Sequence, residues 1–329
     1  MSPDQPLALG APIEIAFDRL LLPSSVTRQG LTLQDLFGNY QEPAPSYDPV
    51  ARVVRMCAPL QPDQTYKLTI VSPQSASDPD GLRAIDGALL DPSLNPVIEF
   101  PVVAGPYLGP DACPQEVDGG AGAPAALPSP VDFCSQVLPI VSNKCGGGLT
   151  SGCHNGSLAA EGLDLTSVQG ILATAIGRVS QESNTGSTAA VAQSPAGTQF
   201  GVNMAIVAAG DPADSWLLYK LLMAVPPPCS STPPPAGFDA GAGCYVGPDN
   251  GGYASPDGGT PHDVPWAPLS DSERATLAGI IPGREMPFPV NPALSVDSPT
   301  NTAANLTLDE LETISQWILQ GATVTTCNE

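Results

Sequence analysis

Short runs of alternating apolar and polar residues fill the first third of the chain, from about residue 7 to residue 104. Alternation with a period of two, interrupted by turns rich in Pro, Asp and Gly, is typical of β-strands that have one buried face. The clearest predicted strands are residues 13–17, 50–56, 65–71 and 97–103. Several such strands in succession predict an antiparallel β-sandwich over residues 1–104.

From residue 131 onward the apolar residues recur at intervals of three and four, which predicts amphipathic helices. One helix leads to Cys145, and another occupies residues 212–222. Their predicted buried residues are Phe133, Val137, Ile140, Val141, Trp216, Tyr219 and Leu222. Residues 131–329 are therefore expected to form a second, mostly α-helical domain with long loops.

Two further helices are marked by capping boxes, in which a Ser or Thr is followed three residues later by Glu. Ser270 and Glu273 form the first box, and Thr307 and Glu310 form the second. The predicted helices are residues 271–280 and 308–320. The second of them carries on one face Leu311, Ile314, Trp317 and Ile318.

Two stretches rich in Pro and Gly separate the predicted elements. Residues 105–130 lie between the strand pattern and the helix pattern and are expected to form a semi-extended linker. Residues 225–268 lie within the helical part and are expected to be a loop insertion, because so polar and broken a stretch cannot form its own core. A disulfide between Cys229 and Cys244 is expected to close this insertion.

The chain is strongly acidic, with 33 Asp and Glu against 11 Lys and Arg and a formal net charge of −22. This charge argues against binding to nucleic acid or to an anionic membrane surface, so basic or neutral partners are expected. The 39 Pro and 33 Gly indicate long irregular connections, yet the hydrophobic content of 42% is too high for a disordered chain.

Eight cysteines in a chain with few lysines favour an oxidising compartment, where disulfides persist. Cys57 can bridge Cys113, just beyond the last predicted strand, although the sequence alone leaves other pairings open. No run approaches the roughly 20 apolar residues that span a membrane, and the first residues lack the features of a secretory signal. We therefore expect a periplasmic or extracellular protein of the cell envelope whose export signal has been removed.

The segment with the most distinctive chemistry is Cys145-Gly-Gly-Gly-Leu-Thr-Ser-Gly-Cys153-His154. In covalent c-type haem attachment, two cysteine thiols add to the vinyl groups, and the histidine that follows the second cysteine binds the iron. Here seven residues separate the thiols instead of the usual two. The extra residues must loop out, which the glycines between the thiols permit. Attachment through Cys153 alone remains an alternative to two thioether bonds.

A haem iron bound by His154 needs a second axial ligand, or else it keeps an open position for chemistry. Met286 is the favoured candidate, because the prolines around it make a rigid stretch that loses little further entropy on ordering. The other candidates are Met56, Met204, Met223 and His262. Met204 and Met223 are expected to pack in the core, and His262 is expected to lie in a solvated loop. Met56 belongs to the first domain.

These features resemble the class I-like c-type cytochrome domains found in envelope proteins of planctomycetes and myxobacteria. The resemblance covers residues 131 to 325 and rests on segments that follow one another in the family's order. They are residues 137–140 before the haem cysteines, Cys153-His154, residues 210–219 on a middle helix, Met286-Pro287, and residues 306–310 with 317–322 at the close. Residues 1–104 resemble bacterial immunoglobulin-like domains of cell-envelope proteins.

The resemblance implies one covalent haem c, attached through Cys145 and Cys153, with His154 as the proximal and Met286 as the distal ligand of the iron. Such a protein carries single electrons between ferrous and ferric states and transforms no substrate. Its negative surface predicts a redox partner with a basic docking surface.

The resemblance also implies that the first and last helices of the second domain cross and pack. Cys134 begins the first helix and Cys327 follows the last. A disulfide between these two cysteines agrees with that crossing and is predicted here.

Two other functions stay open. In one, Cys145 and Cys153 form an ordinary disulfide, and the chain is a haem-free, disulfide-rich binding or structural module of the cell envelope. In the other, an open iron position reduces peroxide, although a second Cys-His pair for a second haem is absent. A zinc site is disfavoured because no second Cys-x-x-Cys pair is present.

Overall fold

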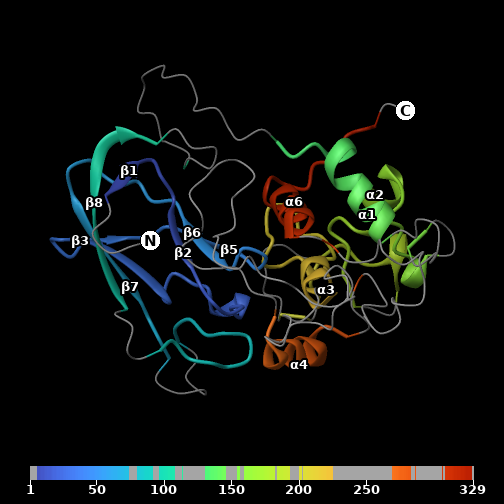
Figure 1. Cartoon of the computed structure of the whole chain (residues 1–329), viewed down its shortest axis with the longest axis horizontal. Coiled ribbons are helices and arrows are strands. Elements are labelled where there is room, and N and C mark those ends of the chain that lie inside the picture. Colours follow the sequence, from blue (N-terminus) through green and yellow to red (C-terminus); the bar gives the residue numbers. More distant parts are fainter. Residues whose placement is uncertain are drawn as a thin grey trace, which may run out of the picture. The chain divides into compact units, whose positions relative to one another are not determined.

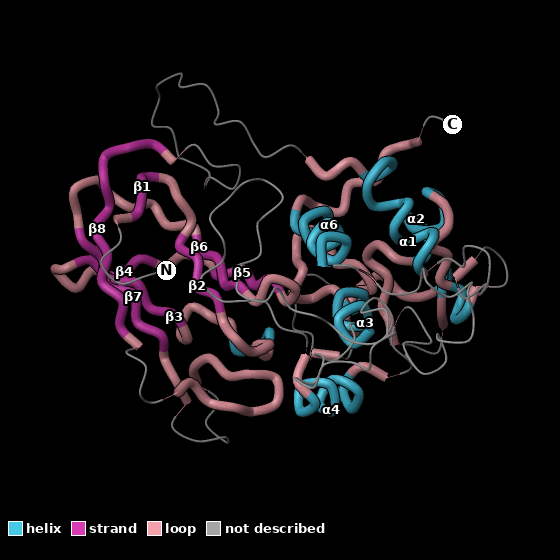
Figure 2. Tube along the Cα trace, viewed as in Figure 1, coloured by secondary structure: helices cyan, strands magenta, loops and turns pink. Residues whose placement is uncertain are grey.

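The chain divides, in the computed structural model, into two compact units (Figure 1). The first unit comprises residues 1–48 and 52–130, and the second comprises residues 49–51 and 131–329. The structure describes residues 6–73, 80–91, 96–107, 113, 130–145, 154–155, 159–181, 184–192, 200–201, 203–224, 269–282, 286, 306 and 308–327. Strands belong to the first unit and α-helices to the second, which confirms a mixed β and α fold class (Figure 2).

The first unit contains two β-sheets. Its strands are β1 (Leu7–Leu9), β2 (Ile13–Ala16), β3 (Leu31–Asp35), β4 (Tyr40–Gln41), β5 (Pro45–Asp48), β6 (Val53–Met56), β7 (Thr65–Ile70) and β8 (Val97–Pro106), with the 3-10 helix η1 (Pro23–Ser25). One sheet has the order β1-β8-β7-β3-β4, and the other has the order β2-β6-β5. The four predicted strands are present as β2, β6, β7 and β8, whereas the short strands β1, β3, β4 and β5 are additional.

The strand pairs described in the two sheets are antiparallel with one exception, the parallel pair of β1 and β8. The prediction of a purely antiparallel arrangement is therefore wrong at this edge. Parallel strands cannot be joined by a tight hairpin. Here the pair brings the first strand of the unit beside its last, with Leu7 opposite Val102.

The core of the first unit follows the period of two expected for strands. Along β7, Tyr66, Leu68 and Ile70 are buried while the residues between them are partly exposed. Phe100 of β8 stacks on Tyr66, with 6.3 Å between the ring centroids. A disulfide joins Cys57, just after β6, to Cys113 and confirms the predicted pairing.

The described part of the second unit is built mainly from helices. They are η2 (Phe133–Val137), α1 (Leu138–Lys144), η4 (Ala160–Gly162), α2 (Val168–Thr174), η5 (Gly186–Thr188), α3 (Trp216–Ala224), α4 (Asp271–Ile280) and α6 (Leu308–Leu319). The first predicted helix corresponds to the π-helical turn η2 continued by α1. Helices α3, α4 and α6 correspond to the other predictions, and α2 is additional.

The capping box at the start of α4 is confirmed. The Ser270 side chain accepts the N–H of Glu273, and the Glu273 carboxylate accepts the N–H of Ser270 at 2.7 Å. This exchange satisfies two backbone donors that the first turn of the helix leaves without partners. The start of the helix is therefore fixed by local sequence.

The first and last helices of the second unit pack against one another. The rings of Phe133 and Trp317 lie 5.6 Å apart between centroids, and both side chains are buried. A disulfide joins Cys134 to Cys327, with the two Cα atoms 5.5 Å apart, and confirms that predicted pairing. The two ends of the unit's sequence are thus joined both by packing and by a covalent bond.

Some predicted features lie outside the described residues. They include the insertion at 225–268, the Cys229–Cys244 disulfide within it, most of the linker at 105–130, and Thr307 of the second capping box. These predictions stay as stated from the sequence.

Candidate functional site

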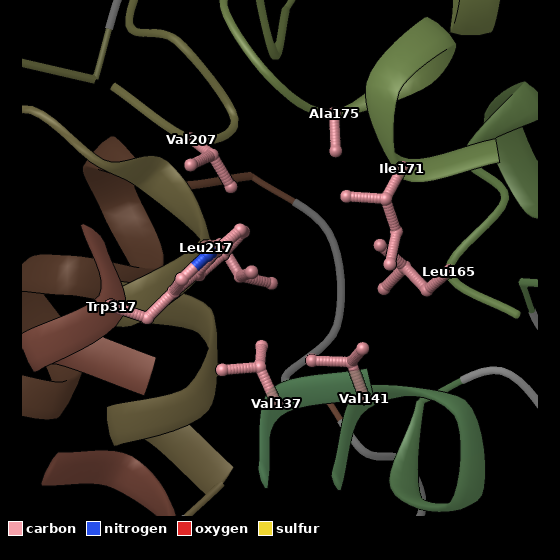
Figure 3. A pocket seen from close by; sticks show the side chains of 8 residues that line it. All are labelled: Val137, Val141, Leu165, Ile171, Ala175, Val207, Leu217 and Trp317. Carbon is pink, nitrogen blue, oxygen red and sulfur yellow. The ribbon is translucent and has the colours of Figure 1, made fainter. Parts of the chain in front are cut away.

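An apolar pocket lies within the second unit (Figure 3). It is lined by Val137, Val141, Leu165, Ile171, Ala175, Val207, Leu217 and Trp317. These side chains come from the first helix, α2, α3, α6 and two connecting segments, and in Figure 3 they surround one shared space. The Trp317 indole N–H donates to the carbonyl of Thr323 at 3.0 Å, so the polar atom of this lining is already satisfied. All eight lining residues are buried, so this space belongs to the hydrophobic core of the unit.

Cys145 lies at the end of the helix that forms one wall of the pocket. It follows Val141 by four residues, which places both on the same face of the helix. Its N–H donates to the Val141 carbonyl at 2.9 Å, and 3% of the residue is exposed. The structure therefore places this predicted attachment residue on the buried face of the first helix. Cys153 lies outside the described residues.

The His154 imidazole is partly buried, and its neighbours set its orientation. Nδ1 lies 3.1 Å from the Leu163 carbonyl oxygen, and the His154 carbonyl accepts the N–H of Leu165 at 3.0 Å. Burial lowers the pKa of the ring, while hydrogen bonds to the carbonyls of Leu163 and Ala160 act in the opposite direction. Because a carbonyl oxygen only accepts, Nδ1 is the donor in the contact with Leu163, and Nε2 is the ring nitrogen that a metal ion could take. Metal-binding histidines are oriented in this way.

A tight turn at Asp164 fixes the segment that contacts His154. The Asp164 carboxylate accepts the N–H of Thr166 at 2.9 Å and its hydroxyl at 2.6 Å. On either side of Asp164, the backbone of Leu163 and Leu165 contacts His154, and the Leu165 side chain lines the pocket. One short segment therefore orients the imidazole and forms part of the pocket wall.

Helix α2 begins directly after this turn. The Ser167 side chain accepts the N–H of Gly170 at 3.0 Å and caps the helix. A Cβ at Gly170 would lie 2.4 Å from the Asp164 carboxylate, so this close approach requires glycine. Sequence reasoning missed α2 and Asp164. The available signal was Ser167 ahead of an apolar run, which is a typical helix start.

Met286 is buried and hydrogen-bonded to α3. Its N–H donates to the carbonyl of Lys220 at 3.2 Å, and 8% of the residue is exposed. Leu217, about one turn earlier on the same helix, lines the pocket. The His154 backbone is hydrogen-bonded to Leu165, which lines the pocket. The Met286 backbone is hydrogen-bonded to α3, which contributes Leu217 to the same lining. The sequence did not single out Lys220.

The other candidate ligands are placed differently. The sulfur of Met204 accepts the N–H of Gly201 at 3.0 Å and the residue is 1% exposed, which agrees with a packing role. Met223 is buried near the end of α3, and Met56 is in β6 of the first unit. His262 lies outside the described residues.

The donor groups of His154 and Met286 are of types that haem iron binds. Among the residues that the structure describes, no group of three or more His, Cys, Asp and Glu side chains lies together. An oriented imidazole and a buried thioether are instead the ligand types that haem iron takes in cytochromes c. The indole N–H of Trp216 is buried and has no acceptor within the described ranges, so a donor remains for an acceptor group of a bound molecule.

Comparison with known proteins gives no assignment, since the chain matches no family model and no curated protein. Across the described ranges, no helix has both the length and the apolar character needed to cross a membrane.

Proposed function

We propose that this chain is an exported monohaem c-type cytochrome that carries single electrons. The observation that supports it most directly is the contact of His154 Nδ1 with the Leu163 carbonyl, because histidines that bind a metal through Nε2 are commonly oriented by such a contact. In this proposal Cys145 and Cys153 attach one haem c covalently, His154 is the proximal ligand, and Met286 is the distal ligand.

A bound haem supplies a one-electron couple between ferrous and ferric iron. The Leu163 carbonyl orients the imidazole that would bind the iron. His154 and Met286 would hold the iron, and with both bound no position would stay open for a substrate. Because a thioether favours ferrous iron, this pair of ligands gives a higher reduction potential than two histidines. The proposed protein is an electron carrier and not an enzyme.

The rest of the chain supports an envelope location. Two disulfides, one in each unit, favour the periplasm or the cell exterior. The first unit, with its two sheets, is proposed to be an immunoglobulin-like spacer. The net charge of −22 favours a redox partner with a basic docking surface, so association should weaken as salt rises.

The alternative function is a haem-free, disulfide-rich binding or structural module. The two disulfides also agree with this alternative, since a cysteine pair links distant residues in each unit. In that case Cys145 and Cys153 pair with each other, and His154 has no iron to bind.

The absorption spectrum and intact mass of protein exported from a host with haem-attachment machinery decide between the two. One covalent haem adds about 616 Da and gives sharp bands on reduction with dithionite. A weak far-red sulfur-to-iron band in the oxidised form, absent from Met286→Ala, identifies the distal ligand. A featureless visible spectrum without added mass contradicts the cytochrome and supports the haem-free module. Rapid cyanide binding by the resting protein would instead indicate an open iron position.

A further inference from the structure

Lys220 is a cation buried within an otherwise apolar stretch of α3. Only 1% of the residue is exposed, and the helix around it reads Trp216-Leu-Leu-Tyr-Lys-Leu-Leu-Met-Ala224. Burial of an ammonium group is unfavourable unless its donors are hydrogen-bonded. An apolar side chain would pack equally well at this position. The role of Lys220 is therefore inferred from the hydrogen bonds of its Nζ atom.

The ammonium group binds the chain just after α4. Nζ donates to the Pro282 carbonyl at 2.6 Å and lies 3.5 Å from the carbonyl oxygen of Ile281. Both carbonyls lie beyond the last residue of α4, where helical N–H donors run out. Nζ also lies 5.0 Å from the centroid of the Trp216 ring, which adds a cation–π contact. The side chain therefore joins α3 to the end of α4.

The backbone of the same residue binds Met286. The Lys220 carbonyl accepts the Met286 N–H at 3.2 Å, so one residue contacts both Pro282 and Met286, the two ends of segment 282–286. We infer that Lys220 is a positioning residue, which holds segment 282–286 so that the Met286 sulfur stays on the haem iron. This inference rests on the proposed cytochrome function.

The test compares oxidised holoprotein variants in cyanide binding and in the far-red band. Cyanide binds only after the sulfur has left the iron, so its rate reports how often Met286 dissociates. Lys220→Leu removes the donor to Pro282 without adding a sulfur atom. Loss of a charge-assisted hydrogen bond changes a local equilibrium about tenfold or more, so cyanide binding should be about tenfold faster and the far-red band weaker.

Leu218→Ala is the matched control, because Leu218 is fully buried on the same helix and has no part in these hydrogen bonds. It should lower the stability of the unit but leave the band and the cyanide rate unchanged. Lys220→Arg keeps a cationic donor and should retain most of the band. If Lys220→Leu does not fold, the neutral and shorter Lys220→Gln is measured in its place, with a smaller rise in rate expected.

Three outcomes are distinguishable. A folded Lys220→Leu with the wild-type band and cyanide rate overturns the positioning role and leaves the cytochrome intact. An equal rise in Leu218→Ala also overturns it, because general loosening then explains the effect. Absence of haem from the wild-type protein overturns the cytochrome and this inference with it. Amide hydrogen exchange at Met286, whose N–H donates to the Lys220 carbonyl, gives a second readout and should be faster in Lys220→Leu than in Leu218→Ala.

Discussion

The two proposed iron ligands are held by contacts of very different range. His154 is oriented by Leu163, nine positions further along the chain. The Met286 segment is held by Lys220, whose bond to Pro282 spans 62 positions. The proximal side is therefore a local structure, whereas the distal side depends on how α3 packs against the end of α4. Since local contacts survive partial opening better than long-range ones, Met286 should leave the iron before His154 does.

The largest expected effect comes from removal of the proximal ligand. His154→Ala should abolish covalent haem incorporation, because no imidazole then follows Cys153 to bind the iron. Met286→Ala should keep the covalent haem and lose only the far-red band. The haem-to-protein ratio, taken from the alkaline pyridine spectrum of exported protein, measures both. A full complement of haem in His154→Ala would remove the distinction between the two sides.

The second prediction concerns the disulfide that joins the two ends of the second unit's sequence. Replacement of Cys134 and Cys327 by serine opens a bond between residues 193 positions apart and should lower the free energy of unfolding of the second unit by about 2–5 kcal/mol. Tryptophan fluorescence in denaturant reports on this unit, because all three tryptophans lie within residues 131–329. Replacement of Cys57 and Cys113 is the matched control. An equal shift of the fluorescence transition in that control would contradict the prediction.

The third prediction concerns a substitution near His154 only. Gly170→Ala places a Cβ 2.4 Å from the Asp164 carboxylate, in the turn that presents Leu163 to His154. Such overpacking should destabilise the unit by about 1–3 kcal/mol and reduce haem incorporation, while loaded protein keeps its far-red band. Gly279→Ala in α4, where a Cβ meets nothing within 4 Å, is the control and should be neutral or stabilise by up to about 1 kcal/mol. Equal haem loss in both variants contradicts the role of the turn.

The elements with strong local signals are those that the sequence predicts correctly. The predicted bounds of α4 agree with the structure, because the Ser270 capping box fixes its start. The bounds of β7 differ by one residue, because its alternation is regular. By contrast, the parallel pairing of β1 with β8 depends on contacts between distant segments, and no local pattern encodes it. Short α2 is stabilised mainly by packing, which weakens its signal in the same way.

The residues of the candidate site also differ in whether a local sequence signal identifies them. His154 is identifiable from sequence because a haem-attachment segment places the ligand next to a cysteine. Leu163 is not, since it acts through a backbone carbonyl, which every residue has. The sequence does not identify Lys220 either, for a different reason. Its neighbours give the helix a nearly continuous apolar pattern, and its partner Pro282 becomes visible only when α3 and the end of α4 are seen together.

The smallest expected effect concerns Asp214, just before α3 on the distal side. Burial, together with the charge of Asp211, raises the pKa of Asp214 from 3.8 to about 6. Between these values the folded state binds more protons here than the unfolded state, so stability from this site is full below about pH 4 and is lost as the pH rises to about 6. Asp214→Asn cannot ionise, so it should raise the free energy of unfolding by about 1 kcal/mol at pH 7, allowing for solvent screening, and hardly at all near pH 4. Denaturant unfolding at the two pH values measures this, and an equal gain at both contradicts the raised pKa.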